Sequence, residues 1–189
     1  QVTSPGPRAQ LLSRAVALHL GVDPRSRTWA EEALALAQQV GDPQALAMAT
    51  CAFSNATLGH PGLVRRHQLL ARLLRTSSRE LGSERLLALL AHHLVASCEL
   101  GDLEEAADLV QRHHQEAERS GRALHAWRDH VFQASLAMGS GHPTDAAAAI
   151  EGAVAIARRH RLPDGRMTEL LQRAALAMWT GDDEVPGYR

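Results

Sequence analysis

The sequence predicts an all-α protein, a right-handed α-solenoid of about nine helices arranged in antiparallel hairpins. Three observations support this prediction. Ala and Leu, the strongest helix formers, supply 33 and 28 of the 189 residues, whereas only 12 residues are Val or Ile. Glycines recur about every 20 residues, and longer pieces of sequence recur about every 40. A unit of two helices and about 40 residues is typical of α-solenoids.

Glycine spacing indicates where the helices end, because glycine readily adopts the left-handed conformation that follows a helix. The glycines that share this spacing are Gly21, Gly41, Gly59, Gly82, Gly101, Gly121, Gly141 and Gly181, with residues 163–165 filling the remaining gap. Apolar residues at helical spacing then predict helices near 8–20, 26–40, 43–58, 62–79, 83–100, 102–120, 122–139, 143–161 and 164–180. We expect residues 1–189 to form one domain, a fragment of a longer protein, with flexible ends at 1–7 and 182–189.

Signals for helix starts agree with these boundaries. Pro43 and Pro143 occupy first-turn positions, where a missing N–H costs no hydrogen bond. Asp42 and Asp102 precede helices and can accept hydrogen bonds as N-caps. Asp145 places a negative charge in a first turn, where it complements the helix dipole.

The 40-residue repeat also predicts where helices touch. Gly101, Gly141 and Gly181 each follow a similar helix end, and an Ala-rich helix follows the first two. Ala106 and Ala146 occupy corresponding positions in those two helices. Small side chains allow two helices to approach closely, so we expect both alanines at helix contacts.

The few Trp and Cys side chains are expected mainly in the core. Trp29 and Trp127 are predicted to pack between helices, whereas Trp179 lies near the end of the array and is predicted to be exposed. Cys51 and Cys98 lie in apolar helical stretches, which favours reduced, buried thiols. Two cysteines cannot form a disulfide framework.

Two segments carry a resemblance to a known family. Residues 99–110 (ELGDLEEAADLV) and 31–47 (EEALALAQQVGDPQALA) resemble the turns and helices of tetratricopeptide repeats. Their order over about residues 10–180 is similar to the helical-repeat region of large bacterial transcriptional regulators, the ATP-binding LuxR type and related antibiotic regulatory proteins. The period departs from the family's, since it is about 40 rather than 34, and the usual aromatic positions are mostly empty. The resemblance implies a cytoplasmic sensor or scaffold segment and transfers no catalytic residue.

The composition excludes several chemistries. All 20 basic residues are Arg, so a P-loop lysine and a Schiff-base lysine are both impossible. The net charge is −1, which argues against a direct nucleic-acid surface. The sequence contains neither a signal peptide nor an apolar run of 18 residues, so no membrane association is expected. We therefore expect a cytoplasmic protein without a cofactor.

Histidines are the most suggestive residues for chemistry. They form adjacent pairs at 92–93 and 113–114, but neighbouring side chains on a helix point about 100° apart, which is poor geometry for binding one metal ion. No H-x-x-x-H, H-E-x-x-H or C-x-x-C motif occurs. We therefore predict no metal site and no enzyme activity, and expect His93 and His113 to be packed and hydrogen-bonded.

The predicted binding surface is the inner face of the solenoid, formed by the first helix of each pair. Polar residues that lie off the apolar stripes of those helices are Asn55, His92, Glu99, His125, Arg128, Asp129, Gln133 and Arg173. They would bind a protein partner, another domain of the same chain or a second copy in a homodimer. The alternative is a small-molecule effector bound between helices, and a hydrolase or metal enzyme is a distant third.

Overall fold

The structure is a computed structural model that describes residues 4–18, 23–59 and 62–181. Every regular element among these residues is a helix, which confirms the predicted all-α class. None of the described helices is long and apolar enough to cross a bilayer. The helices are α1 (Pro5–Leu18), α2 (Ser26–Val40), α3 (Pro43–Ala56), α4 (Leu63–Ser77), the 3-10 helix η2 (Ser78–Glu80), α5 (Ser83–Leu100), α6 (Leu103–Ser120), α7 (Ala123–Gly139), α8 (Pro143–His160) and α9 (Gly165–Thr180).

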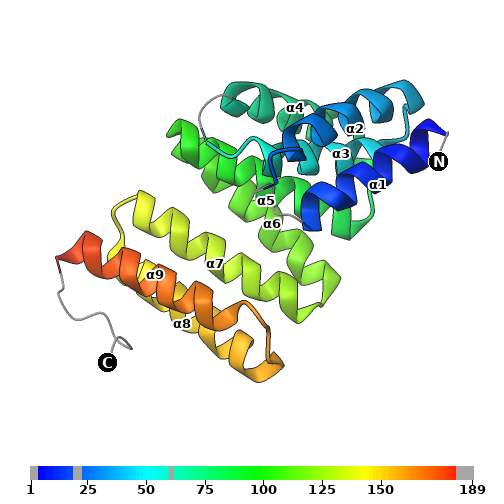
Figure 1. Cartoon of the computed structure of the whole chain (residues 1–189). Coiled ribbons are helices and arrows are strands. Elements are labelled where there is room, and N and C mark those ends of the chain that lie inside the picture. The colour runs from blue at the N-terminus through cyan, green and yellow to red at the C-terminus, as the bar shows by residue number, and fades with distance from the viewer. Residues whose placement is uncertain (1–3, 19–22, 60–61, 182–189) are drawn as a thin grey trace. The chain divides into compact units, whose positions relative to one another are not determined.

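The chain divides into two compact units, Gln1–Leu100 and Gly101–Arg189. The first unit contains α1 to α5 and the second contains α6 to α9 (Figure 1). Helices α3, α5 and α7 begin at residues 43, 83 and 123, which is the predicted 40-residue spacing. The single domain and the right-handed, continuous array stay predictions.

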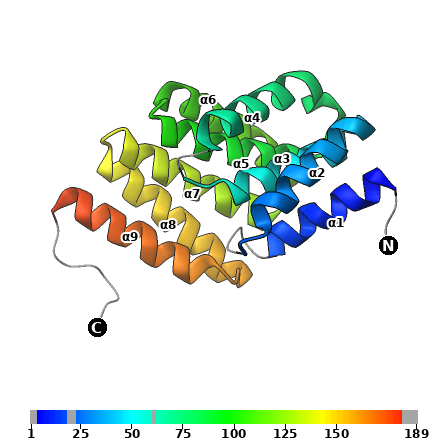
Figure 2. The same ribbon diagram turned by 45° about the horizontal axis from the view of Figure 1, so that its top comes forward.

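In the first unit, each helix packs against its neighbours in sequence. Helix α3 is central, because it contacts α1, α2, α4 and α5 (Figure 2). Its buried face carries Ala45, Ala49 and Phe53, which pack with Leu34 of α2 and Val16 of α1. The alanines let these helices come close, and the larger side chains fill the remaining space.

In the second unit, α7 packs against α6, α8 and α9, and α8 also packs against α9 (Figures 1 and 2). Trp127 of α7 covers Ala153 and Ala157 of α8. Ala106 and Ala146 are both fully buried, which confirms the burial expected from the repeat. Small residues therefore occupy buried positions in both helices.

Helix ends largely follow the sequence signals. Asp42 accepts from the N–H of Ala45 at 2.8 Å, and Asp102 accepts from that of Glu105 at 3.0 Å, so both predicted N-caps are confirmed. Six of the predicted glycines have a positive φ: Gly41, Gly59, Gly101, Gly121, Gly141 and Gly181. The prediction for Gly21 and the flexible end 182–189 lie outside the described residues.

Three departures from the predicted helix boundaries are more than a shift of one or two residues. Gly82 does not follow a helix in the left-handed conformation; instead its carbonyl accepts the first hydrogen bonds of α5. At the end of α8 the left-handed position is taken by Arg161, at φ 51°, and not by a residue of 163–165. Helix α1 begins at Pro5, three residues before the predicted start.

The Trp predictions are confirmed and one Cys prediction is wrong. Trp127 is buried, Trp29 packs against the core of the first unit, and Trp179 is 59% exposed. Cys51 is half-buried, but Cys98 is exposed. Residues 96 and 97 occupy the buried side of the last turn of α5, so position 98 faces outward.

Candidate functional site

The strongest candidate site lies on the first unit, where α1, α3 and α5 enclose a pocket of about 340 Å³ that we call the three-helix groove. Helix α3 forms its middle, because residues 48, 51, 52 and 55 repeat at helical spacing along one side of α3. Residues of α1 and α5 form the two walls. The lining residues are Ser13, Arg14, Ala17, Met48, Cys51, Ala52, Asn55, Arg85 and Ala88.

Two arginines give the three-helix groove a positive charge. Arg14 enters from α1 and Arg85 from α5, and no carboxylate among the described residues pairs with either. Asn55 adds to the lining an amide that can both donate and accept hydrogen bonds. Two guanidinium groups in one pocket repel each other unless an anion lies between them, so the groove is suited to an anionic ligand.

Cys51 lies in the same groove but does not form a reactive thiolate. Burial raises the pKa of the Cys51 thiol to about 12, although the charge of Arg85 opposes this shift. A thiol with this pKa is fully protonated at neutral pH and is a poor nucleophile. Cys51 therefore contributes surface to the groove and no covalent chemistry.

Three predicted site residues belong to the first unit. Asn55 lines the three-helix groove, and His92 lies on α5 two turns beyond Arg85, on the same side of the helix.

Glu99 has a different role, because its carboxylate accepts from Nη2 of Arg66 at 2.5 Å. The Arg66 side chain is fully buried and also donates from Nη1 to the carbonyl of Thr57 at 2.6 Å. This ion pair connects α4 to α5.

In the second unit, Asp129 is the centre of a polar group that we call the Asp129 cluster: His113, His114, Asp129 and Gln133. Nδ1 of His113 lies 3.2 Å from Oδ1 of Asp129, and Nδ1 of His114 lies 2.7 Å from Oδ2. Gln133 donates from Nε2 to the same Oδ2 at 2.9 Å. An ionised carboxylate only accepts, so both imidazoles must carry their proton on Nδ1. Of the predicted site residues, the structure brings Asp129 and Gln133 together.

The Asp129 cluster shifts the pKa values of two of its members. Burial raises the pKa of Asp129, but the hydrogen bonds from His113 and His114 outweigh it, so the pKa lies below its ordinary value. The hydrogen bond with Asp129 raises the pKa of His114, and desolvation opposes this in part. His113 is only 1% exposed, and its ring centroid lies 5.0 Å from the ring centroid of Phe132 in an edge-to-face arrangement. The His113 side chain therefore cannot reach a substrate. The cluster therefore holds α6 against α7.

His125 and Arg128 do not join this cluster. Nδ1 of His125 lies 2.9 Å from Oγ of Ser120, whose hydroxyl donates to the carbonyl of Ala117. Burial lowers the pKa of His125, and the positive charge of Arg128 adds to this effect. Arg128 itself is exposed on α7. His125 is thus a buried polar residue near the start of α7.

Arg173, the last predicted site residue, belongs to a chain of charges between α8 and α9. Its Nη2 donates to Glu151 at 2.7 Å and its Nε donates to Glu169 at 3.2 Å. Glu169 also accepts from Arg158 of α8 at 3.3 Å. Arg173 is therefore already paired with two carboxylates.

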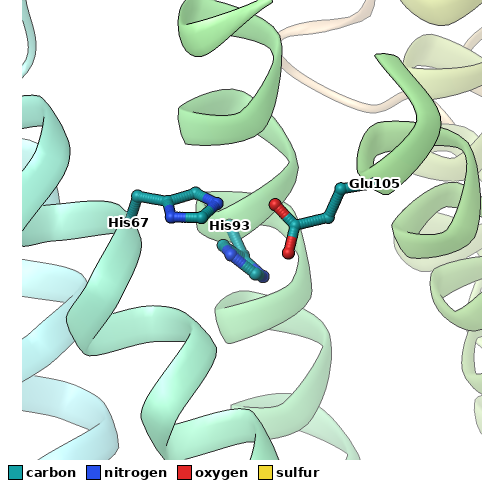
Figure 3. A group of neighbouring side chains, drawn as sticks. All are labelled: His67, His93 and Glu105. Carbon is teal, nitrogen blue, oxygen red and sulfur yellow. The ribbon is translucent and has the colours of Figure 1, made fainter. Parts of the chain in front are cut away.

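A second pair of histidines lies in the first unit, between α4 and α5. The ring centroids of His67 and His93 are 4.7 Å apart, with the ring planes at 48° (Figure 3). His93 is buried, as predicted. The pair by itself supplies two imidazoles, whereas zinc sites use three or four protein ligands.

Sequence reasoning missed the two arginines of the three-helix groove and the histidine partners of Asp129. Arg14 and Arg85 are isolated basic residues on separate predicted helices, and no local pattern marks them as neighbours. The adjacent histidines at 113–114 were a usable signal, because two neighbouring donors on one helix can bind the two oxygens of a single carboxylate.

No protein-family model, no curated protein and no solved structure matches this chain.

Proposed function

We propose that this chain is a non-enzymatic interaction module of the tetratricopeptide-like, helical-repeat type, and that it forms the regulatory part of a cytoplasmic bacterial transcriptional regulator. Its ligand is an acidic segment of a protein partner or of another domain of the same polypeptide. Self-association through such a segment is a special case of this function. The segment binds in the three-helix groove.

The observation that carries this proposal is the pair Arg14 and Arg85, which face one pocket without an acidic partner among the described residues. A charge-assisted hydrogen bond contributes about 1.5–3 kcal/mol, so two such bonds from Arg14 and Arg85 strengthen the binding of an acidic side chain by at least tenfold each. The groove is also lined by Met48 and small residues, which suit the aliphatic stem of a Glu side chain. At about 340 Å³ the groove holds one or two side chains and not a folded domain.

A peptide-binding measurement tests the proposal. We expect fluorescein-labelled hexaglutamate to bind the whole chain, and the matched hexaglutamine peptide to bind at least tenfold more weakly. The variants Arg14→Gln and Arg85→Gln should each weaken hexaglutamate binding about tenfold, because each loses about one charge-assisted hydrogen bond. Arg72→Gln is the matched control, since Arg72 is exposed on α4 and lies outside the groove.

The salt dependence provides an independent readout. Raising the ionic strength from 0.05 to 0.5 M should weaken hexaglutamate binding in the native chain and much less in the double variant Arg14→Gln/Arg85→Gln. Equal binding of hexaglutamate by the native chain, the double variant and the Arg72→Gln control would rule out the three-helix groove as the acidic-peptide site.

Effector sensing is the second candidate function. The observation that favours it is a pocket of about 430 Å³ inside the second unit, between α8 and α9. This volume lies within the range of about 300–1,000 Å³ that small-molecule sites occupy.

A further inference from the structure

The pocket between α8 and α9, which we call the hairpin pocket, lies entirely within the second unit. Its lining residues come from the last two turns of α8, the connection after it and the first two turns of α9. Its volume is about 430 Å³. The lining residues are Val154, Ala157, Arg158, Leu162, Gly165, Arg166, Glu169 and Leu170.

The floor of the hairpin pocket is apolar and closely packed. Val154 and Ala157 of α8 are buried, and Leu162 and Leu170 are half-buried. Gly165 brings α9 close to α8, because a Cβ at this position would lie 2.5 Å from Cβ of Ala157. Such a floor favours the hydrocarbon part of a ligand, since its burial contributes about 25 cal/mol per Å².

The rim of the hairpin pocket carries an excess of positive charge. Arg158 reaches Glu169 only through long contacts of 3.3 and 3.5 Å and is 73% exposed. Arg166 has no acidic partner among the described residues. Residues 158–169 contain four arginines against two acidic residues, Asp164 and the lining residue Glu169, so the surroundings of the pocket keep a net positive charge that attracts anions.

We infer that the hairpin pocket binds a small amphipathic organic anion, with its hydrocarbon part on the Val154–Leu170 floor and its carboxylate between Arg158 and Arg166. The inference rests on the second candidate function and is independent of the three-helix groove. A ligand of this class satisfies both halves of the pocket, because neither a bare anion nor a neutral hydrocarbon uses the apolar floor and the arginines together.

Octanoate is a suitable probe, with acetate and 1-octanol as matched compounds that keep only the charge or only the hydrocarbon. Isothermal titration of the whole chain should give saturable binding of one octanoate per chain. Acetate and 1-octanol should each bind at least tenfold more weakly than octanoate. Octanoate should also raise the melting midpoint, because it binds the folded state.

Point variants test whether octanoate binds in the hairpin pocket. Arg166→Gln should weaken octanoate binding five- to tenfold, and Arg166→Glu should weaken it further, while both variants should melt like the native chain because Arg166 is exposed. Arg159→Gln is the matched control: it removes an exposed arginine from the end of α8, and this residue does not line the hairpin pocket. Its octanoate affinity should stay within twofold of the native value.

The double variant Arg14→Gln/Arg85→Gln separates this inference from the proposed acidic-peptide site. It should lose hexaglutamate binding and keep octanoate binding. If octanoate binding is lost in this double variant and retained in Arg166→Gln, octanoate occupies the three-helix groove and the inference is wrong. It is equally overturned if 1-octanol binds as tightly as octanoate, or if octanoate shows no saturable binding up to 10 mM.

Discussion

Nδ1 of His114 lies 2.7 Å from Oδ2 of Asp129, so a half-exposed imidazole on α6 is hydrogen-bonded to a buried carboxylate on α7. The other oxygen of the same carboxylate accepts from His113. A buried charge is tolerated when its hydrogen bonds are satisfied, and Asp129 has three donors. The α6–α7 contact therefore depends on the charge of one carboxylate.

Asp129→Asn should destabilise the chain by about 2–4 kcal/mol, because three donors lose a charged acceptor and buried His113 loses its partner. Urea unfolding followed by circular dichroism measures the change. The matched control is Asp108→Asn, an exposed acid-to-amide change on α6 that should stay within about 0.5 kcal/mol of the native value. If both variants unfold at the same urea concentration, Asp129 does not hold α6 to α7.

The same pair predicts how stability changes with pH. The pKa of His114 is raised on folding, so its contribution is complete below its unfolded pKa of about 6.5 and is lost as the pH rises through the folded value. The pKa of Asp129 is lowered, so its contribution is present above about pH 3.9 and is lost as the pH falls through the folded value. The His114 and Asp129 contributions to the free energy of unfolding are therefore largest together between about pH 4 and pH 6.5.

His114→Gln tests this window. The variant should lose more stability at pH 5.5 than at pH 9, and the loss should stay below about 1 kcal/mol because solvent screens the half-exposed ring. Unfolding in urea at both pH values gives the difference between native chain and variant. The control is His142→Gln, which makes the same substitution at an exposed histidine before α8 that has no carboxylate partner among the described residues. A loss for His114→Gln that is the same at both pH values would contradict the role of its charge.

Arg66 should matter more for stability than its partner Glu99. Arg66→Ala removes a fully buried guanidinium, leaves the Thr57 carbonyl without this donor and opens a cavity, which together should cost about 2–4 kcal/mol. Glu99→Gln should cost about 1 kcal/mol or less, because Glu99 is partly exposed and the amide retains an oxygen acceptor. Thermal or urea unfolding of the two variants compares their losses of stability.

Arg72→Ala provides the control for the Arg66 prediction, since it truncates an exposed arginine on the same helix and should leave the free energy of unfolding within about 0.5 kcal/mol. Equal losses for Arg66→Ala and Glu99→Gln would instead mean that the ion pair, and not the buried contact with Thr57, dominates.

Most helix boundaries could be predicted because the signals are local. Asp42 and Asp102 cap the turns that follow them within three residues, and the glycines at 41, 101, 121 and 181 each directly follow the last residue of a helix. Arg161 shows the limit, because a non-glycine residue takes the left-handed conformation at the end of α8. Boundary rules describe preferences that packing can override.

The candidate sites could be predicted only in part, since they depend on which helices meet. The sequence predicts three of the site residues as polar residues away from the apolar stripes. One of them, Asn55, lines the three-helix groove, and the other two, Asp129 and Gln133, belong to the Asp129 cluster. Their partners come from other helices at long sequence separation, so helical periodicity carries no information about them. The same limit explains why Glu99 and Arg173, chosen by the same rule, are instead held in ion pairs.

Gly165→Ala tests the closest approach of α8 and α9. The added Cβ would lie 2.5 Å from Cβ of Ala157, so α9 must shift, and overpacking of this kind costs about 1–3 kcal/mol. Gly139→Ala is the matched control, because its Cβ would meet Leu103 at an ordinary 3.5 Å. The control should unfold within about 0.5 kcal/mol of the native chain or be slightly more stable, since Ala favours helix over Gly.

A double-mutant cycle makes this prediction specific to the Gly165–Ala157 contact. Ala157→Gly removes the atom that the new Cβ would strike, so the Gly165→Ala/Ala157→Gly double variant should lose at least about 1 kcal/mol less than the sum of the two single variants. Urea unfolding of the four proteins gives the coupling energy directly. Strict additivity would mean that α9 accommodates the methyl group by moving away from a different contact, and the hairpin pocket would then not depend on the small size of residue 165.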